Sequence, residues 1–211
     1  MSVGGDPDLW SDLVPDQFIP QIIALVLDGW ETFRKPCRDD LELPITKRFC
    51  CWLRRHKNQR RLPFSVWWES PELDLGSARQ VGRIDLRFSH GYREDVYFAF
   101  ECKRLNVVNR AGRRRSLAPE YVQDGMMRFV EGKYARGLDQ GGMLGYVMDG
   151  AVLSAVQAVG KAVADLRREL RMSSGSLERS SLKSDDPRVK ETQHQLERGR
   201  FVIHHLFLAV G

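Results

Sequence analysis

Two neighbouring segments, 81–88 and 95–103, alternate apolar and polar residues in the manner of β-strands that bury one face. The second segment reads DVYFAFECK. Alternation divides it into two faces, with Val96, Phe98, Phe100 and Cys102 on one and Tyr97, Ala99, Glu101 and Lys103 on the other. The polar stretch between the segments, 89–92, is short and contains Gly91, as the turn of a hairpin does. An antiparallel strand pair is therefore the first expected part of the fold.

The rest of the chain divides into segments with helical or strand-like spacing of apolar residues. We expect helices over 17–33, 44–56, 119–134 and 151–170, and strands over 62–69, 142–148 and 200–210. From 44 to 148 the expected order is helix, three strands, helix and strand, which predicts an α/β fold. The segment 172–187 is rich in serine with mixed charges and is expected to be a mobile loop.

The length of 211 residues predicts a single domain, 1–211, with a core over 41–149 and a C-terminal extension over 150–211. The chain has no run of about eighteen apolar residues, so no membrane partner is expected. Its acidic, glycine-containing start at 1–10 differs from a signal peptide. The four cysteines lack CxxC spacing, which predicts a cytoplasmic protein with reduced cysteines rather than a disulfide framework or a cysteine zinc site.

Positive charge is concentrated in two segments of a chain whose net charge is +5. The segment 103–115 contains no acid and carries Lys103, Arg104, Arg110, Arg113, Arg114 and Arg115. The segment 47–61 carries Lys47, Arg48, Arg54, Arg55, Lys57, Arg60 and Arg61. Two such clusters indicate an anionic polymer as partner, with phosphates as the charged groups. The alternative is that each cluster is simply a solvated surface.

Asp85, Glu101 and Lys103 form the group with the clearest chemistry. Glu101 and Lys103 share one strand face about 7 Å apart along the backbone, and Asp85 lies in the expected partner strand. Two carboxylates can hold Mg²⁺ while leaving positions for water and phosphate oxygens, and a nearby lysine can stabilise the charge that develops. The alternatives are an exposed ion-pair face for Glu101 and Lys103, and pairing of Asp85 with Arg83 or Arg87.

The sequences Gly82-Arg83-Ile84-Asp85 and Phe100-Glu101-Cys102-Lys103 resemble the D-x(n)-E-x-K signature of the PD-(D/E)XK nuclease superfamily. The expected element order over 41–149 is also similar to its restriction-endonuclease-like core. The resemblance implies that Asp85, Glu101 and the backbone carbonyl of Cys102 bind Mg²⁺ or Mn²⁺, and that Lys103 serves the attacking water. Many members add an acid from the first core helix. Glu42 is the nearest residue to that position, and Glu69 is the alternative.

The helix expected over 119–134 places Gly125 and Gly132 on the same face as Tyr121 and Arg128. Because glycine inside a helix is less favourable than alanine by about 1 kcal/mol, the two glycines indicate a close approach of another backbone or a ligand. We expect Tyr121, Arg128 and Gln123 to contact nucleic acid. The alternative for Arg128 is a structural salt bridge. The Q-x-x-x-Y spacing of one branch of the superfamily is absent.

The histidines and the paired cysteines are expected to be structural. His204 and His205 lie in an apolar strand, where one should pack in the core and the other should face solvent. Cys50 and Cys51 are expected as small core residues of the helix over 44–56. No histidine or cysteine has partners at the spacing of a metal site or of a Cys–His nucleophile pair.

Together these features predict a metal-dependent endonuclease that hydrolyses DNA, with the arginines of 104–115 binding backbone phosphates. The sequence has no zinc finger and no clear helix-turn-helix. By analogy with bacterial restriction and anti-phage defence systems, we expect a homo-oligomer or a partner subunit. Two alternatives stay open: a catalytically silent nuclease-fold subunit that binds nucleic acid or a partner protein, and an RNase with the same site.

Overall fold

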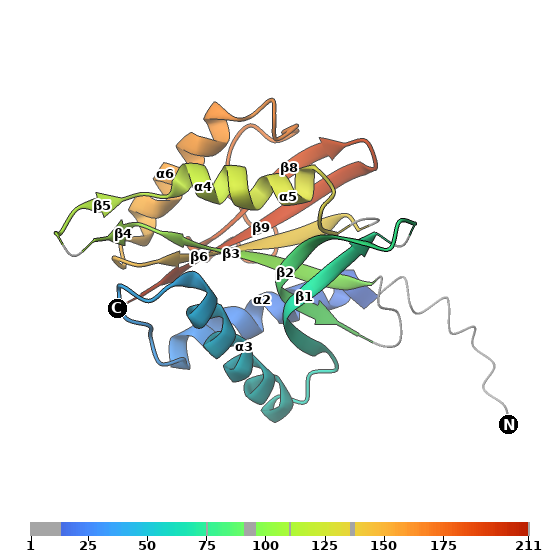
Figure 1. Ribbon diagram of the computed structural model, residues 1–211, viewed down its shortest axis with the longest axis horizontal. Helices are drawn as coiled ribbons and strands as arrows, with labels where there is room; N and C mark the ends of the chain where they lie inside the picture. Colours follow the sequence, from blue (N-terminus) through green and yellow to red (C-terminus); the bar gives the residue numbers. More distant parts are fainter. Residues whose placement is uncertain (1–13, 75, 91–95, 110, 136–137, 211) are drawn as a thin grey trace, which may run out of the picture.

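The computed structural model describes residues 14–74, 76–90, 96–109, 111–135 and 138–210. A mixed seven-stranded sheet with helices on both faces makes this an α/β protein (Figure 1). Helices α2 (Val14–Thr32) and α3 (Glu42–Gln59) cover one face, and α4 (Ala118–Tyr121), α5 (Met127–Val130) and α6 (Val152–Asp165) cover the other. None of these described helices is long and apolar enough to cross a membrane.

The sheet has the strand order β1-β2-β3-β6-β9-β8-β7. Its strands are β1 (Ser65–Asp74), β2 (Arg79–Ser89), β3 (Tyr97–Leu105), β6 (Gln140–Val147), β7 (Glu178–Arg179), β8 (Val189–Leu196) and β9 (Gly199–Ala209). Strands β3, β6 and β9 are parallel, and the other pairs are antiparallel. Two short strands, β4 (Val107–Val108) and β5 (Arg114–Arg115), form a separate ribbon.

Alternation along β3 divides its side chains between two faces, as predicted, and both faces are buried, in two separate cores. Phe98, Phe100 and Cys102 are buried with the apolar residues of α2 and α3. Tyr97 and Ala99 are buried on the opposite face, in the core that includes α4, α5 and α6. A central strand covered on both faces is typical of the parallel part of an α/β sheet. The polar residues Glu101 and Lys103 continue this second face toward the end of β3.

Each predicted helix and strand is present, with shifts at the ends. Helix α3 begins at Glu42, which places this acid in the first turn together with Pro44, a position that proline tolerates. The helix expected over 119–134 is interrupted by a π-helical turn, Val122–Met126, between α4 and α5. Apart from the β4–β5 ribbon, the element order predicted from 44 to 148 is confirmed. The hairpin turn predicted at 89–92 lies partly outside the described residues.

Strand β8 is missing from the predicted elements because several of its inward-facing residues are polar. Thr192 and His194 are fully buried, and the Thr192 hydroxyl lies 2.8 Å from Nε2 of His194. The neighbouring segment 172–187, predicted as a mobile loop, contains β7. Ser181 donates from its N–H and its hydroxyl to the Glu191 carboxylate of β8, both at 2.7 Å. The mobility of this segment stays a prediction.

Candidate active site

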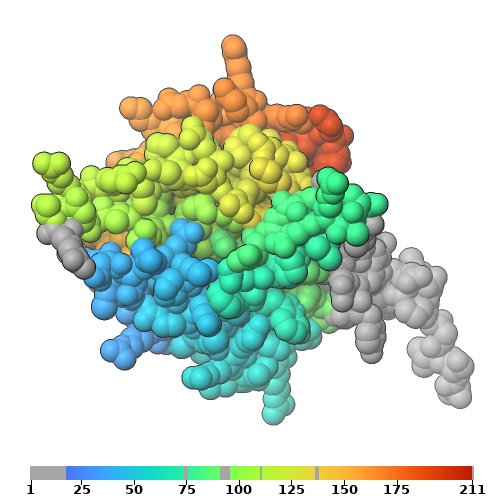
Figure 2. Space-filling model, viewed as in Figure 1, coloured from blue at the N-terminus to red at the C-terminus, as the bar shows by residue number. Residues whose placement is uncertain are grey.

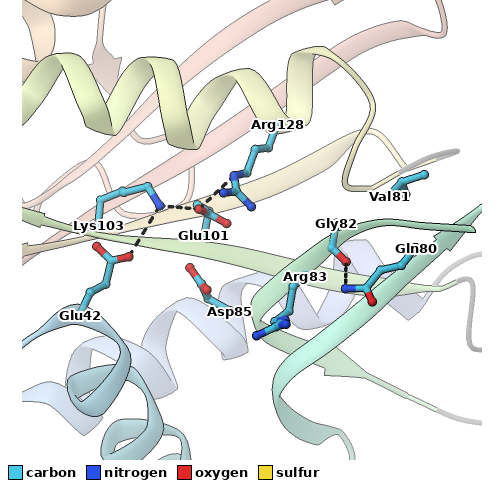
Figure 3. A pocket seen from close by; sticks show the side chains of 9 residues that line it. All are labelled: Glu42, Gln80, Val81, Gly82, Arg83, Asp85, Glu101, Lys103 and Arg128. Atoms are coloured by element: carbon cyan, nitrogen blue, oxygen red, sulfur yellow. Dashed lines mark hydrogen bonds and ion pairs between the residues drawn. The ribbon is translucent and has the colours of Figure 1, made fainter.

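An open pocket of about 610 Å³ lies where β2 separates from β3 (Figure 3). The two strands pair from Ser89 and Tyr97 as far as Leu86 and Phe100, and the next positions along them are Asp85 and Glu101. Helix α3 contributes its first residue, Glu42, and α5 contributes Arg128 from the opposite side of the pocket. The lining residues are Glu42, Gln80, Val81, Gly82, Arg83, Asp85, Glu101, Lys103 and Arg128.

Asp85 projects from β2 toward β3, where its Oδ2 atom accepts a hydrogen bond of 2.7 Å from the N–H of Cys102. Burial raises the pKa of the Asp85 carboxyl to about 7, and the charge of Glu101 adds to this rise. The Cys102 hydrogen bond and the charge of Lys103 oppose the rise without cancelling it. Asp85 is therefore a carboxylate held close to another acid in a poorly solvated place, which a cation would stabilise.

Glu101 is the most buried acid of the pocket, with 1% of its surface exposed. Its Oε1 atom accepts a hydrogen bond of 2.6 Å from Nζ of Lys103 and lies 3.4 Å from Nε of Arg128. Its Oε2 atom is buried and has no hydrogen-bond partner among the described residues. Burial raises the pKa of Glu101, and the charges of Lys103 and Arg128 oppose that effect.

Lys103 lies between Glu101 and Glu42. Its Nζ atom is 3.7 Å from Oε1 of Glu42, whose Oε2 atom accepts a hydrogen bond of 3.0 Å from the N–H of Arg104. Burial alone would lower the pKa of Lys103, but the charges of Glu101 and Glu42 raise it above its usual value. Lys103 is therefore an ammonium group that can donate hydrogen bonds in the pocket, and not a base.

Arg128 approaches the same carboxylate from α5 and is held by Tyr134. Its Nη1 atom donates to the Tyr134 hydroxyl, which in turn donates to the backbone carbonyl of Arg83 in β2. The Tyr134 ring packs on Gly82, where an added Cβ would lie 2.5 Å from the ring carbon Cε1. Tyr134 thus connects α5 to the wall of the pocket formed by β2.

The structure brings together most of the predicted catalytic and metal-binding residues. Asp85, Glu101, Lys103 and Glu42 all line one pocket, and Glu42 is the additional acid named first from the resemblance. Glu69 is absent from the lining of this pocket and pairs with Arg83 at 2.7 Å. The roles assigned to the pocket residues stay predictions.

Tyr121 requires a correction, because it is not available to nucleic acid. It is fully buried, and its hydroxyl lies 3.0 Å from Nδ1 of His205. The π-helical turn after Tyr121 accommodates an extra residue per turn, so that Tyr121 and Arg128 no longer share the face expected of an uninterrupted α-helix. Gln123 lies within this turn and is exposed.

The two glycines of this helix have different reasons. Gly125 is buried, and an added Cβ would meet the end of Met143 and lie 3.6 Å from Cγ of Lys103, so it allows the helix to approach β3 closely. Gly132 follows the end of α5 with a φ of +69°, which glycine adopts readily. The atoms that approach Gly125 belong to side chains, and not to another backbone or a ligand as predicted.

The basic residues of 104–115 do not line the pocket. Arg104 donates to the Asp40 carbonyl at 3.2 Å. On the β4–β5 ribbon, exposed Arg114 and Arg115 pair with Asp149 at 2.8 Å and with Glu120 at 3.1 Å. Arg113 is exposed beside them, and Arg110 lies outside the described residues. Figure 1 shows the ribbon at the margin of the molecule, and its contact with nucleic acid stays a prediction.

Two expectations about buried residues are wrong. His204 and His205 are both buried, because β9 is covered on both faces; burial lowers the pKa of each imidazole. Cys50 is buried in the α2–α3 core as expected, but Cys51 is exposed.

The role of Tyr134 in holding Arg128 and its packing against Gly82 were not foreseen. Gly82 in the Gly82-Arg83-Ile84-Asp85 motif was the signal that could have indicated the close contact.

The pocket acids have two features that bear on cation binding. The unpartnered Oε2 atom of Glu101 and the raised pKa of Asp85 are both features that a bound cation would relieve. Mg²⁺ usually takes one or two protein carboxylates and keeps several water ligands, as these two acids would allow. Among the described residues, the group whose possible ligand atoms all lie within 4.8 Å of one another is Cys37, Asp39 and Asp40; it lies near the surface, and Asp40 is paired with Arg48.

Comparison with models of known protein families, with curated proteins and with solved structures gave no match. Any functional conclusion therefore depends on the chemistry of the pocket.

Proposed function

We propose that this protein is a metal-dependent nuclease with a restriction-endonuclease-like fold that hydrolyses phosphodiester bonds in DNA. One observation carries the proposal: Asp85 and Glu101 line one pocket where β2 and β3 separate, with the Lys103 ammonium 2.6 Å from Glu101. A binding surface for phosphates has no use for two buried carboxylates that repel phosphate. Two acids and a lysine at one open pocket are the groups that metal-assisted phosphodiester hydrolysis needs.

Each pocket residue has a distinct task in this proposal. Asp85, Glu101 and the Cys102 carbonyl would hold Mg²⁺ or Mn²⁺, which when bound supplies an activated water and polarises the phosphate. Lys103 is protonated and donates a hydrogen bond to the attacking water or to a phosphate oxygen, where it stabilises developing negative charge. Arg128 binds a second phosphate oxygen, and Tyr134 holds its guanidinium in place.

The wider context of the activity is part of the same proposal. The arginines of the β4–β5 ribbon bind backbone phosphates outside the pocket, which positions DNA without reading its sequence. By analogy, we place this activity in a restriction or anti-phage defence system, in which a second copy or a partner subunit supplies control.

The test is cleavage of supercoiled plasmid, linear duplex, single-stranded DNA and RNA, with Mg²⁺, Mn²⁺ or EDTA. The variants are Asp85→Asn and Lys103→Ala, with Lys161→Gln as control because Lys161 is an exposed cation on α6. We expect metal-dependent DNA cleavage that both pocket variants abolish and the control retains. If the protein cleaved RNA but no form of DNA, the proposed substrate would be RNA instead of DNA.

A catalytically silent subunit is the second candidate. This candidate is favoured by the ion pairs of Glu101. Lys103 and Arg128 both pair with it and already compensate its negative charge. DNA binding in EDTA that Asp85→Asn leaves unchanged, without cleavage in any metal, would support this candidate and contradict the nuclease.

A further inference from the structure

Trp67 on the edge strand β1 exposes 52% of its surface, although tryptophan is usually well buried. The guanidinium of Arg54 lies over its ring, 5.4 Å from the ring centroid. The next residue, Trp68, is partly buried, and Nζ of Lys47 lies 4.9 Å from the centroid of its ring. Two consecutive tryptophans of β1 are thus each in contact with a cation of α3, and we call these four residues the α3–β1 seam.

The seam leads to the pocket along both of its elements. Trp68 pairs with Leu86 of β2, next to Asp85, and Trp67 is one position farther along β1. On α3, Lys47 and Arg54 follow Glu42 by about 8 and 18 Å along the helix axis, at about 1.5 Å per residue. Figure 2 shows the surfaces of α3 and β1 side by side on one face of the molecule.

The charge of the seam suits a polyanion. Helix α3 carries Glu42 as its single acid against the cations Lys47, Arg48, Arg54, Arg55 and Lys57. Arg48 pairs with Asp40 at 2.5 Å. Within the part of the chain that the structure describes, Lys47, Arg54 and Arg55 form no ion pair, and Arg54 is fixed beside Trp67 by a hydrogen bond of 2.6 Å to the Val66 carbonyl. Phosphates would therefore find uncompensated cations here.

An exposed indole beside such cations should bind single-stranded and double-stranded nucleic acid differently. A duplex keeps its bases stacked inside and would present phosphates to the cations, without using the Trp67 ring. A single strand presents its bases as well, and base stacking on an aromatic ring adds affinity that does not depend on sequence. The combination of ring and cation at one place is thus the composition of a single-strand site.

We propose that the α3–β1 seam binds a single-stranded segment of the DNA substrate beside the cleavage site, with a base stacked on Trp67 and phosphates on Lys47 and Arg54. This inference rests on the proposed nuclease function and narrows its substrate to DNA with an unpaired tail, flap or displaced strand. The alternative is that a second copy of the chain binds here, by pairing with the edge strand β1. A symmetric interface here would bring the same cations together, which opposes it.

The test measures binding in EDTA, so that the intact pocket can be used without cleavage. Fluorescence anisotropy would compare a labelled dT oligonucleotide, a blunt duplex and the same duplex with a dT tail. We expect Trp67→Ala to weaken binding of the dT strand and the tailed duplex by about 5- to 150-fold, and Trp67→Phe to restore most of it. Binding of the blunt duplex should stay the same. Lys47→Gln should reduce the slope of log affinity against log salt by about 0.7.

Two exposed residues of α6 provide controls: Leu153→Ala removes an apolar side chain and Lys161→Gln removes a cation, and neither should change binding. Equal losses for the dT strand and the blunt duplex in Trp67→Ala would overturn the inference. So would a dimer in light scattering that Trp67→Ala dissociates without loss of dT affinity, since the seam would then be an interface between copies.

The outcomes also separate this inference from the nuclease itself. Metal-dependent cleavage together with unchanged dT affinity in Trp67→Ala would retain the nuclease and reject the seam. Binding of dT that depends on Trp67, with no cleavage in any metal, would reject the nuclease and retain the seam as a nucleic-acid site.

Discussion

Asp85 and Glu101 are the next residues of β2 and β3 beyond the last pair, Leu86 and Phe100. Had the ladder continued, the two acids would be neighbours across a closed sheet. Because the strands separate there, both carboxylates open onto the pocket, while the polypeptide around them still limits their solvation. The local break in pairing therefore creates both the space for a substrate and the electrostatic conflict that a cation would resolve.

The first prediction concerns the pH dependence of stability without metal. The pKa of Asp85 rises from 3.8 to about 7 on folding, so the folded state holds this proton more tightly than the unfolded chain. The resulting stability is complete below pH 3.8 and is lost as the pH rises through 7. Asp85→Asn should remove this loss, and its advantage over the wild type in EDTA should grow from pH 5 to pH 8 by at most about 3 kcal/mol.

Urea unfolding at the two pH values measures this difference. Asp165→Asn is the matched control, because Asp165 is exposed on α6. Adding Mg²⁺ at pH 8 should stabilise the wild type and leave Asp85→Asn nearly unchanged. A variant that follows the wild-type pH dependence would show that Asp85 is ionised without cost in the folded protein.

The second prediction separates positioning of Arg128 from stability. Tyr134→Phe removes the hydroxyl that accepts from Arg128 and donates to the Arg83 carbonyl. We expect kcat to fall about tenfold, which corresponds to about 1.4 kcal/mol and is the size of one net hydrogen bond. The control is Tyr121→Phe, which also removes a buried hydroxyl, but one that contacts His205 away from the pocket.

Steady-state cleavage and thermal unfolding of both variants would be measured together. Tyr121→Phe should lower the unfolding temperature without changing kcat. If both variants lost kcat in proportion to stability, Tyr134 would be a structural residue with no role in placing Arg128.

The third prediction concerns Glu42, whose two oxygens have different partners. Oε2 accepts from the Arg104 N–H, and Oε1 lies 3.7 Å from Nζ of Lys103. Glu42→Gln keeps an oxygen for Arg104 but removes the negative charge, so the Mg²⁺ concentration for half-maximal cleavage should rise several-fold. Glu42→Ala should show the same rise and also lose about 1 kcal/mol of unfolding free energy.

Metal titrations of cleavage and urea unfolding distinguish the two effects. Glu120→Gln serves as control because Glu120 pairs with Arg115 on the exposed ribbon. An unchanged Mg²⁺ dependence in Glu42→Gln would mean that the first turn of α3 contributes to packing alone.

Much of this site was predictable because strand alternation determines which side chains share a face. Once β2 and β3 are expected as a hairpin, Glu101 and Lys103 must lie together, and Asp85 can reach them from the partner strand. The separation of β2 from β3 could not be predicted; beyond it, Tyr134 packs against Gly82 of β2, and β3 continues paired with β6. Those contacts join residues far apart in the sequence.

Where the prediction was wrong, a long-range contact had overridden a local rule. Tyr121 appeared to share a face with Arg128, but the π-helical turn rotates the helix between them and Tyr121 is buried against β9. One of His204 and His205 was expected to face solvent, but both are buried, and Nε2 of His205 lies 2.9 Å from the Thr192 hydroxyl in the core. A strand whose buried residues are polar lacks the apolar alternation from which strands and their buried faces are predicted.

The last prediction uses two glycines with different surroundings. A Cβ on Gly82 would lie 2.5 Å from Cε1 of the Tyr134 ring, so Gly82→Ala must displace the ring that holds Arg128. We expect it to lower the unfolding free energy by about 1–3 kcal/mol, as overpacking does, and to reduce kcat as Tyr134→Phe does. Gly160→Ala is the control: apart from its chain neighbours and the backbone of its own helix, no described atom lies within 4 Å of the added Cβ, and in the middle of α6 alanine should stabilise by up to about 1 kcal/mol. Urea unfolding and steady-state cleavage of both variants measure these effects. If Gly82→Ala left kcat unaltered, Arg128 would function without the Tyr134 ring in its place against β2.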